Sequence, residues 1–173
     1  MPAPRRQERL AVNDLSVNDD PSAHIARRCA AAILERDPTV ARLGIALLEV
    51  APGYAQLALR VGPEMLNSLG NCHGGTSFTL ADVAFAVACS STNQAGVGAH
   101  CAIDYLRPAT LNDVLTATAV VSHQGRSASL VDVDVVDQNG RRIIQLRGRS
   151  SNFGRPFLSA AELDTDPASL PEV

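Results

Sequence analysis

A single long apolar segment, Gly74 to Ser91, limits what this chain can fold into. Its hydrophobic positions run nearly all the way round a helix, which is typical of a helix covered on most of its sides. Such a helix would begin at Gly74 or Gly75 and span roughly 26 Å at ~1.5 Å per residue. It contains one carboxylate, Asp82, and residues 65–103 contain no other Asp, Glu or Arg. Because an unpartnered carboxylate is costly to bury, we interpret Asp82 as a candidate active-site acid.

The composition excludes several classes of function. The 173 residues suit one domain, and a hydrophobic content of 46% predicts a globular chain. A net charge of −3 and 3% aromatic residues argue against a nucleic-acid partner. All 15 basic residues are arginine, which excludes a lysine Schiff base. Because neither a membrane-spanning run nor a signal peptide is evident, we expect no membrane partner and a cytoplasmic protein.

The four cysteines are Cys29, Cys72, Cys89 and Cys101, and none belongs to a C-x-x-C pair. Two of them adjoin a histidine, in Cys72-His73 and His100-Cys101. Adjacent side chains of an extended chain point to opposite faces, so each pair offers one ligand to a given site. We therefore expect free thiols and no metal.

The rest of the chain reads as an α+β domain. We expect a flexible N-terminal arm at 1–20, a domain at 21–157 and a loosely held acidic tail at 158–173. An amphipathic helix at 21–36 is ended by Asp37-Pro38, and 64–71 is a loop or a short helical turn. The predicted strands are 43–50, 54–61, 97–106, 114–123, 127–136 and 142–150. Asn139-Gly140 is the strongest hairpin signal.

A sheet of about five to six antiparallel strands needs a cover for its apolar face, and the apolar helix fits that role. A long central helix wrapped by a curved antiparallel sheet is the hotdog fold. Several motifs, spread over about residues 40–153, resemble the PaaI branch of hotdog acyl-CoA thioesterases. They are Met65-Leu66-Asn67, Cys72-His73-Gly74-Gly75, Leu80-Ala81-Asp82, Ile103-Asp104-Tyr105-Leu106-Arg107-Pro108, Leu115-Thr116-Ala117 and His123-Gln124-Gly125.

This resemblance implies an enzyme that hydrolyses acyl-CoA thioesters without a cofactor, as a homotetramer built from homodimers. Its general base or nucleophile falls on Asp82, its oxyanion-hole amide on Gly74 and a polar side chain near the thioester on Asn67. His73, beside the helix start, joins this catalytic set. The branch is associated with phenylacetate breakdown, so phenylacetyl-CoA and hydroxyphenylacetyl-CoA lead, with medium-chain fatty acyl-CoA also open.

Spacing adds a geometric condition to this assignment. Gly74 and Asp82 are eight residues apart on one helix, ~12 Å along its axis, so one carbonyl does not reach both. If both act on it, they come from different subunits whose central helices run antiparallel across a dimer interface. Unpaired N–H groups at a helix N-terminus suit an oxyanion, and glycine permits its close approach.

Substrate-binding residues are expected at the helix start and at strand ends. Gly75 and Phe78 adjoin the thioester and the acyl slot. Arginine recognises phosphate through its planar donor fork, and the resemblance places CoA contacts near two loops, with Arg126 the leading candidate. These loops supply Arg107, Pro108, Gln124, Gly125, Arg126 and Ser127.

Each assignment has a simpler alternative. Asp82 could pair with a strand arginine, Asn67 could satisfy loop backbone groups, and the glycines could serve close packing. Related enzymes often carry a Ser or Thr near the scissile bond, whereas Ala86 lacks a hydroxyl and His100 is no simple substitute. A non-catalytic acyl-CoA-binding module stays open as a rival class. A hydratase is less favoured because His73 and Asp82 do not match the spacing of its His-Asp pair.

Overall fold

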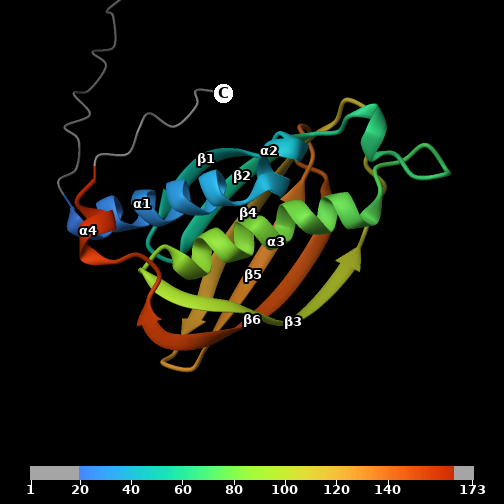
Figure 1. The fold of residues 1–173 in the computed structure, drawn as a ribbon. Helices are drawn as coiled ribbons and strands as arrows, with labels where there is room; N and C mark the ends of the chain where they lie inside the picture. The colour runs from blue at the N-terminus through green and yellow to red at the C-terminus, as the bar shows by residue number, and fades with distance from the viewer. Residues whose placement is uncertain (1–19, 166–173) are drawn as a thin grey trace, which may run out of the picture.

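The structure is a computed structural model that describes residues 20–165. Most of the predicted N-terminal arm and the last eight residues of the predicted tail lie outside the described residues. The helices are α1 (Pro21–Arg36), α2 (Pro38–Leu43), α3 (Gly74–Ser90) and α4 (Ala160–Leu163), with a short 3-10 turn, η1 (Pro63–Met65) (Figure 1). The strands are β1 (Ala46–Ala51), β2 (Tyr54–Arg60), β3 (Gln94–Tyr105), β4 (Val114–Gln124), β5 (Ala128–Val136) and β6 (Arg142–Pro156).

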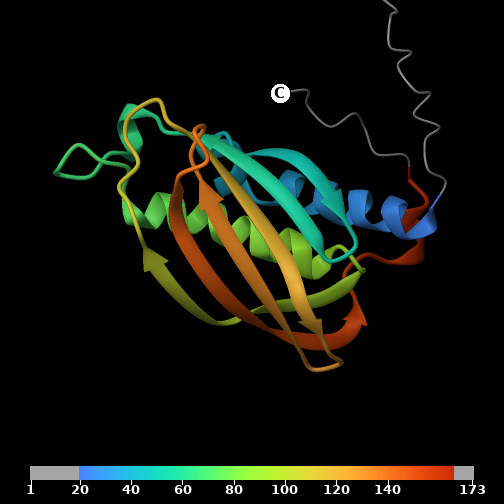
Figure 2. The same cartoon turned by 180° about the vertical axis from the view of Figure 1, so that it is seen from behind.

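These strands form one antiparallel sheet of six strands in the order β1-β2-β4-β5-β6-β3. The sheet curves around α3, with α1 beside that helix, as the two opposite views show (Figures 1 and 2). The predicted hotdog arrangement, a long central helix wrapped by a curved antiparallel sheet, is confirmed. Gly148 of β6 illustrates how closely helix and sheet approach, because a Cβ built there would lie 2.6 Å from the Phe85 ring.

The sides of α3 differ in how well they are covered. Leu80 and Val87 face the sheet and are fully buried, and each such side chain stabilises the fold by about 2 kcal/mol. One turn apart on another side, Phe78 and Ala86 are half-buried, while Asp82 between them is exposed. Within one protomer, the helix is therefore covered on most sides, as predicted, except along the strip that carries the lone acid.

Asp37-Pro38 ends one helix and begins another, which the sequence analysis did not predict. The Asp37 N–H donates to the Ile33 carbonyl at the end of α1, while its side chain accepts from the Thr39 N–H at the start of α2. Proline suits the first helical position because no N–H partner is needed there. The prediction of a strand from residue 43 is thus wrong at its start, since α2 continues to Leu43 and β1 begins at Ala46.

The last predicted strand is longer than expected, because β3 and β6 pair from Gln94↔Pro156 to Tyr105↔Ile144. Beyond β6, the expectation of a loosely held tail differs from the structure for residues 158–165. Leu158 is only 1% exposed, and Phe157 and Leu163 pack with it against α1. Burial of this leucine anchors the segment, although the residues that follow it are mostly small or acidic.

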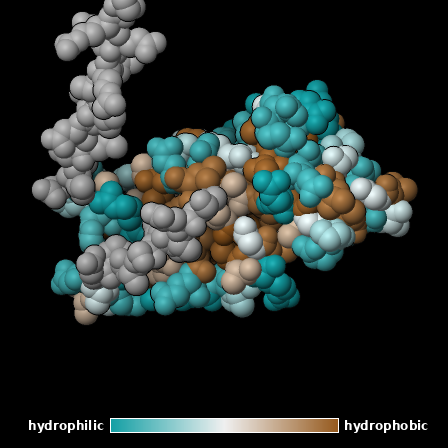
Figure 3. All heavy atoms as spheres, turned by 90° about the horizontal axis from the view of Figure 1, so that it is seen from above, coloured by the Kyte–Doolittle hydropathy of each residue, from teal (hydrophilic) through white to brown (hydrophobic). Residues whose placement is uncertain are grey.

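The described surface carries two features that bear on partners. Strand β3 is an edge strand, and Val97 on it is 54% exposed. On the face seen from above, hydrophobic atoms occupy the middle between hydrophilic margins (Figure 3). Among the described residues, no helix combines the length and hydrophobicity that crossing a membrane requires.

Candidate active site

The start of α3 is fixed by the histidine before it. His73 is the N-cap, and its ring Nδ1 accepts a hydrogen bond from the Gly75 N–H at 2.9 Å. Its own N–H donates to the Met65 carbonyl at 2.8 Å, which ties the cap to η1. The Gly74 N–H has no hydrogen-bond partner within the described part of the chain. His73 therefore occupies one of the two glycine amides and leaves the other as a free donor at the positive end of the helix.

Gly74 is also held from its other side. The Tyr105 hydroxyl donates to the Gly74 carbonyl at 3.3 Å, and the Ser77 hydroxyl donates to the same oxygen at 3.1 Å. A Cβ built on Gly74 would lie 3.1 Å from the Tyr105 ring. Glycine at this position thus allows the ring to pack over the helix start, an interaction that the sequence analysis missed.

A hollow of about 280 Å³ opens beside this turn. Four site residues predicted from the sequence line it: Asn67, Gly74, Arg107 and Pro108. Tyr105, which had not been predicted as a site residue, lines it as well. The Arg107 guanidinium donates to the Arg142 carbonyl at 3.0 Å, which anchors that side chain at the rim. Gly74, whose N–H is free, therefore lines a space that a ligand can enter.

Asn67 has one end committed and the other available. Its side-chain oxygen accepts from the Leu69 N–H at 2.9 Å and from the Asn71 N–H at 3.2 Å. Because backbone N–H groups only donate, this end must be the oxygen, and the NH2 group is left as a donor. The predicted loop-stabilising role and the predicted site role are thus compatible, since they use different atoms.

Asp82 is exposed on the protomer surface, contrary to the burial expected of it. The predicted alternative of an ion pair with a strand arginine is absent from residues 20–165. Partial loss of hydration raises the pKa of the Asp82 carboxyl, and the negative charge of Asp37 raises it further. The Asp82 charge also helps raise the pKa of the Cys101 thiol, after burial, so β3 passes close by.

Asp82 and the Gly74 hollow are separate within one protomer, because Asp82 does not line that hollow. Phe78, predicted for the acyl slot, is half-buried on the Asp82 side of α3 and packs against the core. His100 is exposed on β3 next to Cys101. One chain therefore presents a donor at one place and an acid at another.

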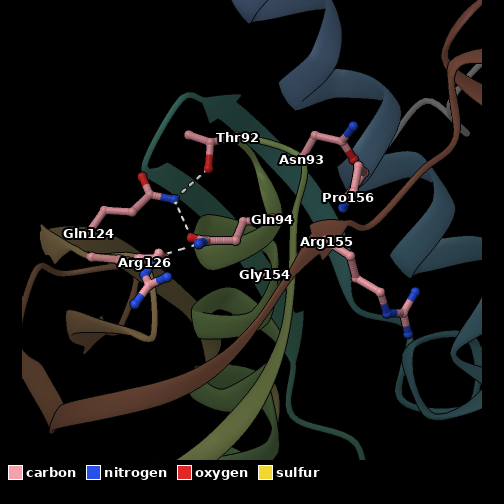
Figure 4. Close-up of a pocket in the computed structure, with 9 residues that line it drawn as sticks. Thr92, Asn93, Gln94, Gln124, Arg126, Gly154, Arg155 and Pro156 are labelled. Atoms are coloured by element: carbon pink, nitrogen blue, oxygen red, sulfur yellow. Dashed lines mark hydrogen bonds between the residues drawn. The ribbon is translucent and has the colours of Figure 1, made fainter.

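A second hollow, of about 530 Å³, holds three more of the predicted substrate residues: Gln124, Gly125 and Arg126. The Gln124 amide donates to the Thr92 hydroxyl and to the Gln94 side-chain oxygen (Figure 4). Arg126 and Arg155 lie on its margins, and Arg155 had not been singled out from the sequence. Ser127 is outside this lining, where its carbonyl accepts from the Asn152 N–H at 2.9 Å.

The thiols are free, as predicted. Burial raises the pKa of Cys29 and of Cys89 to about 11, so both are weak nucleophiles at neutral pH. Within residues 20–165, no three His, Cys, Asp or Glu side chains gather as a metal-binding group would.

Comparisons with known proteins show the family of this chain. Residues 69–144 match the family described as the thioesterase superfamily. Acyl-coenzyme A thioesterase PaaI of Escherichia coli (strain K12) is 41% identical over 132 residues, which are 76% of this chain and 94% of that protein. Human acyl-coenzyme A thioesterase 13 is 33% identical over 112 residues, covering 64% of this chain and 80% of that protein.

Solved structures give the same result. The E. coli PaaI protein from the phenylacetic acid degradation operon superposes with a TM-score of 0.76 at 40% identity, covering 78% of this chain and 97% of that one. A hypothetical thioesterase from Streptococcus pneumoniae, solved with coenzyme A, gives 0.63 at 31% identity, covering 65% of this chain and 88% of that one. The chain belongs to the thioesterase superfamily.

Proposed function

We propose that this protein hydrolyses acyl-CoA thioesters at a site shared by two copies of the chain, with Asp82 from one copy and Gly74 from the other. The observation that carries this proposal is the free Gly74 N–H beside a hollow. A preorganised donor of this kind stabilises the oxyanion of acyl transfer and contributes about 10²- to 10³-fold in rate. The superfamily and the thioesterase relatives support the reaction class.

A composite site follows from the separation of the two groups. Gly74 and Asp82 are about 12 Å apart along α3, which is too far for one carbonyl to meet both. The uncovered strip around Asp82 gives a partner copy a place to pack. Two α3 helices running antiparallel would bring each Asp82 to the partner's helix start, and a two-fold axis would form both sites at once.

The uncovered edge of β3 supports the same assembly. Around Gly98, the side chains of residues 96–102 are mostly small, and none of them is Asp, Glu or Arg. Natural proteins usually guard an open edge with charge, proline or a cover, because its free N–H and C=O groups pair readily. Pairing of two β3 edges would join the sheets of two copies. Further association of such dimers gives the homotetramer that we propose.

In the proposed reaction, Asp82 removes a proton from water, and the hydroxide adds to the thioester carbonyl. The oxyanion accepts a hydrogen bond from the Gly74 N–H, and the Asn67 side-chain amide is a second donor. Collapse of the tetrahedral intermediate breaks the C–S bond, and the CoA thiolate leaves and takes up a proton. In the nucleophilic variant, Asp82 attacks the carbonyl itself and water then cleaves the acyl anhydride. Neither route uses a metal or a cofactor.

The two hollows suit the two ends of the substrate. We assign the thioester to the Gly74 hollow and the CoA phosphates to the arginine-bearing loops, with Arg126 leading. The acyl group would lie against Phe78 and its apolar neighbours on α3. Aryl groups such as phenylacetyl and hydroxyphenylacetyl lead, because the similar E. coli protein comes from a phenylacetic acid degradation operon. Medium-chain acyl groups are the second candidate, and the proposed setting is the cytoplasm, where CoA esters are metabolised.

A thiol-release assay over aryl and fatty acyl-CoAs tests the proposal. The wild type should release free CoA, and Asp82→Asn should lower kcat by about 10²- to 10⁴-fold, as expected for loss of a general base or nucleophile. Glu49→Gln, an exposed acid on β1, is the matched control and should retain full activity. Near-normal turnover by Asp82→Asn would remove the assignment. Binding of acyl-CoA by the wild type without thiol release would instead support the rival binding module.

A further inference from the structure

Asn93 connects the end of α3 to a segment that is remote in sequence. Its side-chain oxygen accepts from the Leu158 N–H at 2.7 Å, and its side-chain amide donates to the Leu158 carbonyl at 3.1 Å. Its backbone carbonyl accepts from the Phe157 N–H at 3.2 Å, and its backbone N–H donates to Ser90 at 2.8 Å. Asn93 has a φ of 59°, a left-handed conformation that asparagine tolerates better than most residues. Four backbone and side-chain groups of one residue are thus committed to this junction.

The segment that Asn93 holds is anchored at its far side on α1. We call residues 157–165 the C-terminal latch. Leu158 is buried against Cys29 of α1. Arg28 donates to the Glu162 carbonyl at 2.7 Å, and Arg36 forms an ion pair with the Glu162 carboxylate at 2.9 Å. The latch therefore spans from α1 to the turn after α3 and contacts both.

The turn that contains Asn93 is also one wall of the second hollow. Thr92, Asn93 and Gln94 all line it, as does Pro156, which immediately precedes the latch (Figure 4). Gln94 accepts from the Gln124 amide at 2.9 Å and donates to the Gly125 carbonyl at 3.3 Å. The wall therefore supports the turn that carries Arg126, the leading candidate for the CoA phosphates.

We propose that the C-terminal latch, acting through Asn93, positions the Thr92–Gln94 wall and hence the Arg126 turn for the phosphate end of CoA. Asn93 is in this sense a positioning residue and not a catalytic one. The latch lies beyond residues 69–144, the part of the chain that matches the superfamily model. The inference rests on the proposed function, because it names the segment that positions the phosphate-binding part of the proposed CoA site.

The test compares CoA with pantetheine, which lacks the nucleotide and its 3′-phosphate. Asn93→Gly keeps the left-handed backbone and removes both side-chain bonds to Leu158, and Leu158→Ala removes the buried anchor. Each should raise the KM for an acyl-CoA about tenfold, the loss expected when hydrogen bonds to a charged group are weakened. The KM for the matching acyl-pantetheine and the kcat for both esters should stay within about twofold, since the thioester end is untouched.

Three controls separate positioning from general destabilisation. Leu158→Met conserves the volume of the anchor and should restore a nearly normal KM for acyl-CoA. Ile45→Ala empties a buried core position away from the hollow and should lower the melting temperature without changing the CoA-to-pantetheine ratio. Calorimetric titration with CoA alone measures the same effect without any chemistry.

The outcomes distinguish the latch from the reaction. Equal KM increases for both esters, or unchanged CoA binding in Asn93→Gly and Leu158→Ala, would overturn the latch inference alone. The same selective loss in Ile45→Ala would also overturn it, because any weakened fold would then suffice. A wild type that neither binds CoA nor releases thiol would overturn the proposed function and, with it, the latch inference.

Discussion

Along α3, the first turn and the stretch around Asp82 differ in how many contacts their own chain makes to the proposed site groups. At the first turn, His73 occupies the Gly75 amide while Tyr105 and Ser77 grip the Gly74 carbonyl. Around Asp82, the carboxylate is exposed and has no ion-pair partner among the described residues. The donor half of the candidate site is preorganised by its own chain, whereas the acid half is left open.

This difference explains how a reactive acid can be carried at acceptable cost. A carboxylate that was buried and unpaired in every protomer would weaken folding, but one at an open face keeps part of its hydration and, in the proposed dimer, loses it only when the second copy packs over it. The donor has no such penalty, because a helix N-terminus leaves its first N–H groups unpaired in any case. The following predictions test whether the two halves differ in this way.

Of the effects compared below, the largest is expected at the first turn of α3, the half that one chain completes. Gly74→Ala places a Cβ 3.1 Å from the Tyr105 ring, so either the ring or the helix start moves by a few tenths of an ångström, and displacement of the Gly74 donor should lower kcat by up to about 10²-fold. The double variant Gly74→Ala with Tyr105→Ala removes the obstructing ring and should recover part of that loss in thiol-release assays. A double variant that is no more active than Gly74→Ala would show that the ring is not the obstacle.

The Asp82 half of the site should depend on pairing of the β3 edge with a second copy. Val97→Asp introduces a charge on this exposed apolar edge and should shift the protein from dimers towards monomers, lowering the activity about tenfold, since charge guards an edge against pairing. Sedimentation velocity measures the state, and thiol release measures the rate. Val120→Asp, on β4 and similarly exposed, is the control and should keep active dimers. Fully active Val97→Asp monomers would contradict a site shared between chains.

Mixing variants tests which chain supplies which half. Equal amounts of Asp82→Asn and Gly74→Ala chains, unfolded and refolded together, should give heterodimers with one intact site and one doubly defective site. Random pairing then restores about one quarter of wild-type activity, whereas each variant alone stays nearly inactive. Failure to recover activity, with heterodimers verified by mass spectrometry, would argue that both groups act within one chain.

The smallest effect concerns stability and pH. Because the fold raises the pKa of Asp82, the protonated form is the one that folding favours. The stabilisation is therefore full below the unfolded pKa of about 4 and is lost as pH rises through the folded pKa. Asp82→Asn should raise the melting temperature at neutral pH by at most about 2 °C, since solvent screens an exposed group. The difference should vanish near pH 4, and a gap independent of pH would have another cause.

Much of the fold could be predicted because its signals are local. The all-round apolar run at 74–90 and the hairpin turn at Asn139-Gly140 each specify their element without reference to the rest. The helix α2 was missed because Asp37-Pro38 was read only as a stop, although the same pair caps the next helix. The docking of Leu158 was missed because a single apolar residue in an acidic segment carries no periodic signal.

The candidate site divides in the same way. Residues 67, 74 and 82 could be predicted as site residues because an amide side chain, a helix start and an isolated acid are each recognisable in the sequence. The exposure of Asp82 was not readable, since an apolar helix indicates burial without saying whether its own chain or another provides the cover. The contact of Tyr105 with Gly74 joins residues 31 apart, and only the return of β3 past the helix start creates it.

The uncovered edge of β3 has a kinetic consequence. If turnover requires two chains, the rate per milligram falls on dilution, because the assembled fraction obeys mass action. A thioester that touches both chains opposes that loss by binding the assembled form in preference. The substrate concentration would then govern the fraction of assembled enzyme as well as the turnover rate of each assembled molecule.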